Sequence, residues 1–339
     1  MGKRWQRMPD GAQWGRFGAD DQLGRLNLLT PDKVRQGAAE VREGLRFNLS
    51  LPLDVPGKQL LHPARHPPAL KPVFRDGMCY FHFAMRHYNP AATDVINDDA
   101  MLIASQYSSQ WDSLAHVGAL FDADGDGTAE AVWYNGFRSV DPALGGPTYG
   151  QVGVHHLGIE TMAAHGIQGR GVLVDLHAHF GRERRPVGYA DLMRAMDRDG
   201  VRVEPGDMLL LHTGFAEMLL EMRGDPDPAA LHGQCCGLDG ADPALQRWIA
   251  DSDLAALIAD NFAVELPPAD IAAPRAPGPL LPLHELCLFK LGLHLGELWH
   301  LTPLARWLRA NGRSRFLLTA QPLNMPGAVG SPAAAIATV

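Results

Sequence analysis

GRGVLVDLHA, residues 169–178, is a short apolar run with glycines at one end and polar residues at the other, a pattern typical of a buried strand. A second run of the same kind, GDMLLLHTG, follows at 206–214. Between them, YADLMRAMDRDG at 189–200 is predicted to be a helix that stops at its glycine. Strands that alternate with helices predict a largely buried sheet, because the connecting helices cover its faces.

The same alternation continues toward both ends of the chain. Helices are predicted at 159–167, 241–252 and 303–312, and strands at 254–265 and 315–323. Nearer the start, Thr30 is a suitable N-cap, with Pro31 at the first helical position and Asp32 in the first turn, so a helix is expected to begin there. The fold class that follows is α/β with a mixed sheet core.

A proline-rich segment follows this first helix. Residues 51–72, LPLDVPGKQLLHPARHPPALKP, contain too many prolines to sustain a helix or a central strand. We expect an extended N-terminal arm that runs over the surface and serves contacts in a homodimer or homotetramer. Residues 1–75, which hold the helix and the arm, are assigned to the same domain as the core at 76–339.

Composition excludes several classes of function. A chain of 339 residues with 46% hydrophobic content can bury a sizeable core. Its formal net charge is −8 and its Lys and Arg residues are scattered, which argues against a nucleic-acid partner. No run of about 18 residues is free of charge and proline, and the N-terminus lacks an apolar signal segment, so we expect no membrane span and a cytoplasmic location. The four cysteines lack C-x-x-C spacing, which fits reduced thiols in that compartment.

Common catalytic motifs are missing from the chain. No G-x-S-x-G, Walker A, G-x-G-x-x-G or H-E-x-x-H motif is present, which disfavours a serine hydrolase, an NTPase and a dinucleotide-dependent enzyme. What remains is SQYSSQWDSLAHVG at 105–118, with Gln106, Gln110, Asp112 and His116. In an extended segment Gln110 and Asp112 face one ligand, and a turn can return His116 to it. The segment predicts either a metal site with a proton carrier or a polar turn whose groups satisfy one another's hydrogen bonds.

A second group of candidate ligands lies far along the chain. His284 in LPLHELCLF and Glu297 in GLHLGELWHL are of the types that bind zinc or manganese, and a fold could bring them to Asp112. His294 and His300 are expected to be partly buried structural histidines, and the same alternative applies to His177 and His179, which end a strand and border the pocket. The further candidates for lining a substrate pocket are Trp111, His177, His179 and His300.

Segments spread over nearly the whole chain carry a family resemblance. They are FGADDQLGRLNLLTP at 17–31, SQWDSLAHVG at 109–118, WYNG at 133–136, GRGVLVDL at 169–176, VEPGDMLLLHTG at 203–214, ADNFAVE at 259–265, LPLHELCL at 281–288, LGELWHL at 295–301 and GAVGSP at 327–332. In this order they resemble the putative cyclase family, which includes kynurenine formamidase, isatin hydrolase and trans-dienelactone hydrolase. The resemblance implies a swivelling β/β/α domain with a metal-dependent hydrolase core.

The family signature is His-x-Gly-Thr-His-x-Asp-x-x-x-His, in which the first two histidines and the aspartate bind metal and the last histidine acts as acid or base. At the two ligand histidines this chain has glutamines, and this Gln form resembles the branch typified by trans-dienelactone hydrolase. The implied metal ligands are Gln106, Gln110, Asp112, His284 and Glu297. The implied catalytic residue is His116.

The implied chemistry is hydrolysis of a small cyclic ester or cyclic amide by metal-activated water. Two amide oxygens in place of two imidazoles harden the ligand set, so one or two ions of zinc or manganese are expected, with magnesium as a further candidate. A metal-dependent cyclase or dehydratase, in which no water adds, is an alternative. A non-catalytic relic is another, because two ligand positions have changed.

An acidic stretch outside these groups resembles a calcium loop. FDADGDGTAEAVW at 121–133 copies the opening of an EF-hand loop with Asp122, Asp124 and Asp126. The bidentate glutamate of such a loop is replaced by Trp133, so we expect a solvated acidic loop there.

Overall fold

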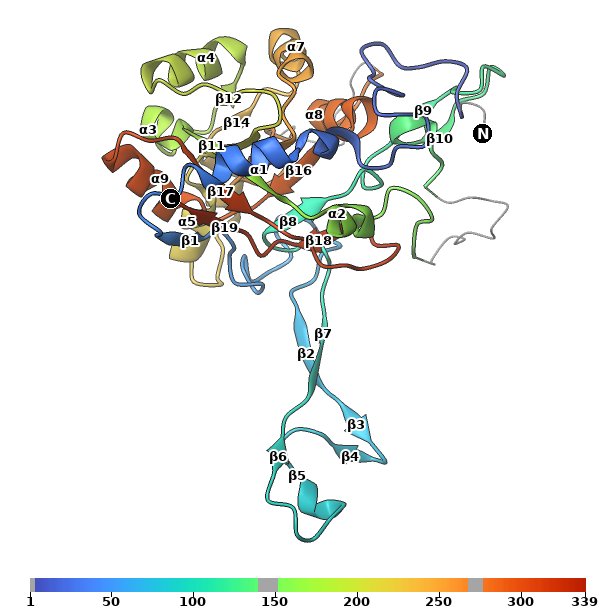
Figure 1. The fold of residues 1–339 in the computed structure, drawn as a ribbon, viewed down its shortest axis with the longest axis vertical. Helices are drawn as coiled ribbons and strands as arrows, with labels where there is room; N and C mark the ends of the chain where they lie inside the picture. Colours follow the sequence, from blue (N-terminus) through green and yellow to red (C-terminus); the bar gives the residue numbers. More distant parts are fainter. Residues whose placement is uncertain (1–3, 140–151, 268–276) are drawn as a thin grey trace.

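A nine-stranded sheet runs through the body of the molecule, and the computed structural model describes residues 4–139, 152–267 and 277–339 (Figure 1). In order across the sheet the strands are β1 (Arg46–Asn48), β19 (Ile336–Thr338), β17 (Arg315–Thr319), β11 (Gln168–Asp175), β13 (Met208–His212), β15 (Ala256–Ala259), β16 (His294–Glu297), β8 (Gln110–Asp112) and β18 (Gly330–Pro332). Strands β11, β13, β15 and β16 are parallel neighbours, and antiparallel strands extend the sheet on both sides. The expected α/β fold with a mixed sheet is confirmed.

The predicted helices form close to their expected positions. The helices of the described residues are α1 (Pro31–Ala38), α2 (Ile159–His165), α3 (Leu176–Phe180), α4 (Tyr189–Arg198), α5 (Phe215–Glu221), α6 (Pro228–Gly233), α7 (Pro243–Asp251), α8 (Pro282–His284) and α9 (Thr302–Ala310). A π-helical segment, Glu285–Leu291, continues α8, and short 3-10 turns lie at Gly24–Leu28, Met85–His87 and Tyr134–Gly136. The side chain of Thr30 accepts a hydrogen bond from the backbone N–H of Lys33 at 3.4 Å, which confirms the predicted N-cap.

The sheet is covered on both faces, as its near-continuous apolar strands predict. In β11, Val172 and Val174 join one core cluster, together with apolar residues of α4, α7 and the 282–291 segment. Leu173 joins a second cluster with residues of α2 and α9. This division follows from the alternation of side chains along a strand.

A long ribbon projects away from the body (Figure 1). It consists of β2 (Ala69–Pro72) paired with β7 (Asp99–Leu102), and it ends in the small pairs β3 (Phe74–Arg75) with β4 (Met78–Cys79) and β5 (Phe83–Ala84) with β6 (Val95–Ile96). We call residues 69–102 the arm. The predicted arm at 51–72 differs: most of it lies against the body, where Leu51 and Val55 are buried. Its prolines remove backbone donors, so strand pairing begins only at Ala69.

Other features of the structure bear on the sequence predictions or complete the description of the fold. The boundary expected between residues 75 and 76 lies within the arm, between β3 and β4. No helix in the three described ranges is long and apolar enough to cross a membrane. All four cysteines are free thiols, and only Cys79 is exposed. Small two-stranded sheets pair β9 (Ala119–Phe121) with β10 (Glu130–Val132) and β12 (Pro186–Val187) with β14 (Gly237–Leu238).

Candidate metal centre

Strand β8 carries the central polar motif into the sheet. It lies between β16 and β18, with Gln110 directly opposite Glu297 of β16. Because side chains alternate along a strand, Gln110 and Asp112 point to the same face. The chain then turns, with the backbone N–H of His116 donating to the carbonyl of Ser113 at 3.0 Å. This turn keeps the His116 ring near Asp112.

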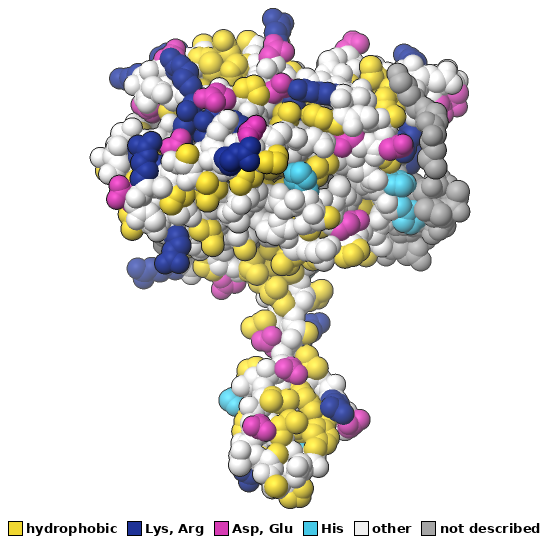
Figure 2. All heavy atoms as spheres, in the orientation of Figure 1, with side chains coloured by type: hydrophobic (Ala, Val, Ile, Leu, Met, Phe, Trp, Pro, Cys, Tyr) yellow, Lys and Arg dark blue, Asp and Glu magenta, His cyan; other side chains and the backbone are white. Residues whose placement is uncertain are grey.

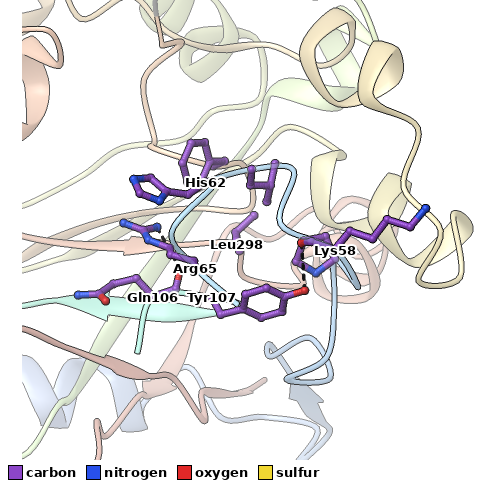
Figure 3. Close-up of a pocket in the computed structure, with 9 residues that line it drawn as sticks. Lys58, His62, Arg65, Gln106, Tyr107 and Leu298 are labelled. Atoms are coloured by element: carbon purple, nitrogen blue, oxygen red, sulfur yellow. Dashed lines mark hydrogen bonds between the residues drawn. The ribbon is translucent and has the colours of Figure 1, made fainter. Parts of the chain in front are cut away.

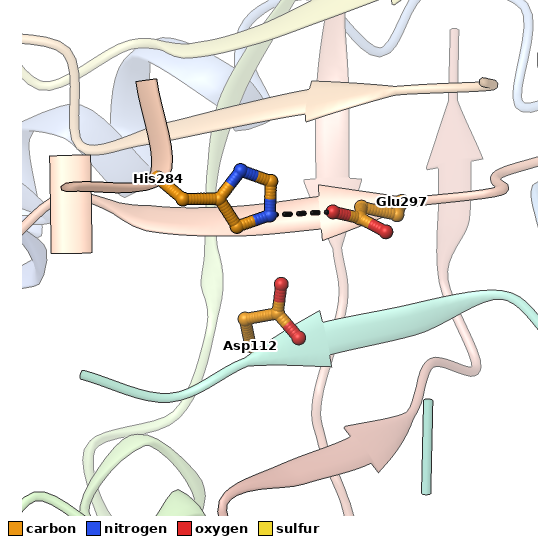
Figure 4. A group of neighbouring side chains, drawn as sticks. All are labelled: Asp112, His284 and Glu297. Carbon is orange, nitrogen blue, oxygen red and sulfur yellow. Dashed lines mark hydrogen bonds and ion pairs between the residues drawn. The ribbon is translucent and has the colours of Figure 1, made fainter. Parts of the chain in front are cut away.

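Three buried side chains meet on this face of the sheet (Figure 4). Asp112, His284 and Glu297 each present a ligand atom within 4.8 Å of the others. Nε2 of His284 is 3.1 Å from Oε1 of Glu297, and the amide nitrogen of Gln110 donates to Oε2 of Glu297 at 3.0 Å. The fold therefore brings together segments that lie far apart in the sequence. We call these three residues the acidic–histidine cluster.

Glu265 fixes the orientation of the His284 ring by contacting Nδ1, the nitrogen that does not face Glu297. Nδ1 of His284 donates to Oε1 of Glu265 at 3.0 Å, and the backbone N–H groups of Leu283 and His284 donate to the same carboxylate. This contact keeps a proton on Nδ1 and aims Nε2 at the cluster, where Nε2 would become a ligand when a cation displaces its proton. The two residues before Glu265 have positive φ values, 71° for Ala263 and 58° for Val264. This conformation is uncommon for residues other than glycine, above all for a β-branched residue such as Val264.

The cluster contains buried acceptors that lack a partner. Both carboxylate oxygens of Asp112 and Oε1 of Gln110 are buried and have no hydrogen-bond partner among the described residues. Burial and the neighbouring charge of Glu297 raise the pKa of Asp112 to about 8. Burial would lower the pKa of His284, but the hydrogen bonds to Glu265 and Glu297 raise it to about 10. Unpaired acceptors and buried carboxylates around one point fit a bound cation.

His116 and Gln106 lie at the edge of this cluster. Nε2 of His116 is 3.9 Å from Oδ1 of Asp112, and burial together with the charge of His284 lowers the pKa of His116 to about 4. The ring is therefore neutral near pH 7. The amide nitrogen of Gln106 is buried without a partner in the described chain, and it packs so close to Gly330 that a Cβ there would lie 2.4 Å away.

The remaining pocket candidates lie elsewhere. Trp111 points to the opposite face of the sheet from Asp112, where it is fully buried and packs edge-on against Trp299. The alternation that aims Gln110 and Asp112 at the cluster sends Trp111 into the core, so it lines no pocket there. His294 is also buried, and burial lowers its pKa to about 3.

The other three histidines are engaged outside the cluster. His177 lies in α3, with Nδ1 3.1 Å from the carbonyl oxygen of Thr213. His179 pairs with Asp199, and His300 pairs with Glu217, at 2.8 and 3.0 Å. Thus the structure does not bring His177, His179 or His300 to Asp112. Each of them lies beyond the end of a strand and contacts a different partner there.

Figure 3 shows a small cavity whose lining includes Leu298, the residue after Glu297. Its wall comes from the proline-rich segment together with the start of the polar motif, and the lining residues are Pro56, Lys58, Leu61, His62, Arg65, Gln106, Tyr107, Phe262 and Leu298. The sequence interpretation assigned no function to Arg65 or Glu265. The only local signals were a basic residue among prolines and a glutamate at the end of an apolar strand.

In the acidic loop at 121–133, backbone N–H groups of the loop donate to its own carboxylates. The ligand atoms of Asp122, Asp124 and Asp126 lie within 4.8 Å of one another. The carboxylate of Asp122 already accepts from the N–H groups of Gly125 and Gly127, at 2.8 and 3.2 Å, and pairs with an arginine. The solvated loop stays a prediction.

Comparison with known proteins adds an independent line of support. The family model described as "Putative cyclase" matches residues 47–266. A crystal structure described as a novel cyclase is similar, with a TM-score of 0.74 and 30% identity over 97% of this chain and 99% of that chain. Isatin hydrolase A from Labrenzia aggregata and from Ralstonia solanacearum share the fold, with TM-scores of 0.54 at 13% and 15% identity, over 90% and 91% of this chain and 97% of each of those chains. Among curated proteins, no sequence matches this chain.

Proposed function

Since the chain belongs to the family described as "Putative cyclase", we propose that it is a metal-dependent hydrolase that opens a small cyclic ester or cyclic amide. The observation that carries this proposal is the acidic–histidine cluster, in which both oxygens of Asp112 lack a partner among the described residues. A buried carboxylate without a partner is strongly destabilising. A divalent cation is the partner that would satisfy Asp112, His284 and Glu297 together.

The side chains around the cluster suit a hard cation. Asp112, His284 and Glu297 would hold it, with Oε1 of Gln110 as a further free acceptor. Oxygen donors with a single imidazole make manganese competitive with zinc and keep magnesium a candidate, and we propose one or two such ions. When bound, a divalent cation supplies Lewis acidity toward a carbonyl and lowers the pKa of water to about 7.

His116 is proposed as the proton carrier. Its pKa is lowered to about 4 by burial, so Nε2 is free to accept a proton from the attacking water at neutral pH. The same nitrogen then gives that proton to the leaving oxygen or nitrogen as the ring opens. Its place beside Asp112, 3.9 Å from Oδ1, keeps it next to the proposed reaction centre.

Water is the proposed nucleophile. Burial raises the pKa of Cys235 and of Cys236 to about 12, so neither thiol is ionised near pH 7. The hydroxyl of Ser109 donates to the backbone carbonyl of Leu298, which commits it to the fold. None of these side chains is an activated nucleophile at the acidic–histidine cluster, so ring opening should take one displacement.

Labelled water tests the reaction class. Metal-loaded protein given a panel of lactones and cyclic amides in ¹⁸O water should place one labelled oxygen in each new carboxylate. Asp112→Asn should lose both bound metal and turnover, whereas Asp251→Asn, on an exposed position of α7, should keep both. Turnover without label would instead assign a cyclase or dehydratase. A wild-type protein that binds no divalent metal would indicate a non-catalytic relic.

The role of His116 has its own test. His116→Ala should lower kcat by about 10²–10⁴ while metal content stays at the wild-type level, because the ring moves protons and holds no ion. His165→Ala, an exposed position at the end of α2, is the matched control. An unchanged kcat in His116→Ala would remove the proton-transfer role, and lost metal would make His116 a ligand.

A further inference from the structure

Arg65 is a cation without a carboxylate partner. It is half-buried in the wall of the cavity, and its Nη1 donates to the backbone carbonyl of Gln106 at 3.0 Å. Within the described residues it forms no ion pair, whereas Lys58 in the same wall pairs with Asp225. A guanidinium has five N–H donors, so most of its hydrogen-bonding capacity is left for a ligand.

Arg65 lies beside the segment that leads to Asp112. The backbone carbonyl of Gln106 accepts from Arg65, and the side-chain amide of Gln106 packs against Gly330. Gly330 of β18 is the strand partner of Asp112 of β8, so Gln106 extends from Arg65 to the neighbour of Asp112. A ligand bound by Arg65 would therefore lie close to the proposed metal.

Apolar side chains make up part of the cavity wall. Phe262 and Leu298 line the cavity, and the guanidinium of Arg65 lies 5.8 Å from the centre of the Phe262 ring. The hydroxyl of Tyr107 donates to the backbone carbonyl of Lys58 at 3.2 Å, so it is committed to the fold. An unpaired cation beside apolar side chains is suited to a small compound that carries one anionic group.

We propose that Arg65 binds a carboxylate on the substrate and thereby selects lactones or cyclic amides that are anionic before the ring opens. This inference rests on the proposed hydrolase function and names the substrate class of the same site. The guanidinium would take the existing carboxylate, while the carbonyl to be attacked lies toward Asp112. Arg65 is thus a specificity-determining residue, because it would hold the substrate at a point away from the reacting bond.

Matched substrates test this selectivity. A lactone with a ring carboxylate and its methyl ester differ in one charge, and wild-type protein should prefer the carboxylate form in kcat/KM. Arg65→Gln should reduce kcat/KM for the carboxylate form by about 10–100-fold, as expected for a charge-assisted hydrogen bond, and change the methyl ester by less than about threefold. Arg194→Gln, an exposed arginine of α4, removes the same charge and should change neither. Equal losses on both substrates would overturn the proposal.

A binding measurement separates this inference from the proposed function. Calorimetry with 2-furoate, a planar ring carboxylate that cannot be hydrolysed, needs no turnover. Its affinity should fall at least tenfold in Arg65→Gln and stay unchanged in Arg194→Gln. If no lactone or amide is hydrolysed yet furoate shows this pattern, the reaction class is wrong and Arg65 still binds carboxylates. Equal furoate affinity in both variants rules out the role of Arg65.

The arm supports a second, independent inference. All eight residues of β2 and β7 are exposed, and a lone two-stranded ribbon is marginally stable in water. Large apolar side chains nevertheless gather along it, as Figure 2 shows at its stem and tip. Those with at least 41% exposure are Leu70, Phe74, Phe81, Tyr88, Val95, Met101 and Leu102. These exposed side chains indicate that another surface covers the arm.

We infer that a second copy of this chain covers the arm, through reciprocal exchange in a two-fold dimer. Seven such side chains, exposing roughly 100 Å² each, would bury about 700 Å² from each arm, or about 1,400 Å² for two, which lies within the usual range for a stable interface. The charges on the arm are mixed, since Lys71 and Arg75 lie near Asp76 and Asp99, so an anionic membrane surface is a poorer match. An exchange of arms also follows naturally from two-fold symmetry.

Light scattering on the full chain tests the arm. Wild-type protein should have the mass of a dimer or of a dimer of dimers, and the double variant Leu70→Asp, Leu102→Asp should shift to the monomer mass with an unchanged circular dichroism spectrum. Leu120→Asp, an equally exposed leucine on β9, is the control and should keep the wild-type mass. A monomeric wild type, or a double variant that keeps the wild-type mass, would overturn the inference.

Discussion

At the scale of single residues, Glu265 controls which nitrogen of His284 faces the cluster. Its carboxylate accepts from Nδ1 of His284 and from two backbone N–H groups, so it fixes both the tautomer and the orientation of the ring. Groups that orient a metal-binding histidine typically change metal affinity without touching the metal. Glu265 is therefore a positioning residue in the proposed function.

Glu265→Gln should weaken metal binding by about 10–100-fold while the protein stays folded. An amide keeps the size of the side chain but removes its charge and turns an N–H group toward the donors of Leu283 and His284. Competition with a chelator measures the affinity. Glu285→Gln, whose native carboxylate pairs with Lys290 at 3.2 Å near the surface, provides the control. Equal affinities in the two variants would contradict the positioning role.

A second buried histidine determines a pH dependence of stability. Nδ1 of His212 is 2.7 Å from Asp175, and Nε2 is 2.9 Å from Thr302. Burial lowers the pKa of His212, but the hydrogen bond to Asp175 and the charge of Asp260 outweigh it and raise the pKa. Burial raises the pKa of Asp175, and the hydrogen bond to His212 outweighs it and lowers the pKa.

The two shifts define a pH window. The stabilisation from His212 is full below its unfolded pKa of about 6.5 and is lost as pH rises through the raised folded value. The stabilisation from Asp175 is full above its unfolded pKa of about 3.9 and is lost as pH falls through its lowered folded pKa. Urea unfolding should show that His212→Asn costs about 1–3 kcal/mol near pH 5.5 and less at pH 9. A cost that is equal at both pH values would show that folding does not shift the pKa of His212, and a larger cost at pH 9 would show that folding lowers it.

At the scale of elements, local pattern predicted the strands that have their own apolar run. β11, β13, β15 and β17 lie where glycines and turns bound such runs, and their helices follow. β8 and β16 carry the cluster, yet β8 has the sequence Gln-Trp-Asp and β16 includes a histidine and a glycine. Their strand character comes from pairing with each other and with buried neighbours, which no local propensity encodes.

The packing beneath β8 and β16 should therefore support the cluster. Trp111 and Trp299 meet behind it with ring centres 5.0 Å apart, and both are fully buried. Trp111→Ala should lower the free energy of unfolding by about 3–5 kcal/mol and also weaken metal binding, because the strand loses its anchor. Trp307→Ala on the outer part of α9 should cost less and leave the metal affinity unchanged. Full metal affinity in Trp111→Ala would show that pairing alone holds β8.

At the scale of the whole molecule, the cluster forms where antiparallel β8 joins the parallel strands. Pairing of β8 with β16 brings Asp112 and Glu297 together, and His284 joins them from α8. Residue types suggested Asp112, His284 and Glu297 as ligands and the family resemblance joined them into one site, but neither assigned a role to Arg65 or Glu265. The roles of these two residues depend on which segments the fold brings close to the cluster, and local sequence does not encode this. For the same reason the arm was expected at 51–72, whereas it is formed by residues 69–102.

For the whole molecule, the proposed metal should offset the free-energy cost of burying the carboxyl group of Asp112. Without a cation, Asp112 is a fully buried carboxylate with no hydrogen-bond partner in the described residues and with Glu297 beside it. Because the pKa of Asp112 is raised to about 8, folding at neutral pH must either bury this charge or take up a proton, and both cost free energy. Asp112→Asn removes that cost, so the metal-free variant should be more stable than the metal-free wild type, by about 1–3 kcal/mol.

Metal should then reverse the order of the two proteins. Free metal at about 1,000 times its Kd stabilises a protein that binds it by about 4.1 kcal/mol, whereas a variant that does not bind gains nothing. Thermal unfolding with chelator and with added manganese or zinc measures both states, and Asp251→Asn should behave as wild type throughout. If Asp112→Asn is less stable than wild type in chelator, Asp112 supports the fold through a contact of its own, and its burial is structural rather than a preparation for the cation.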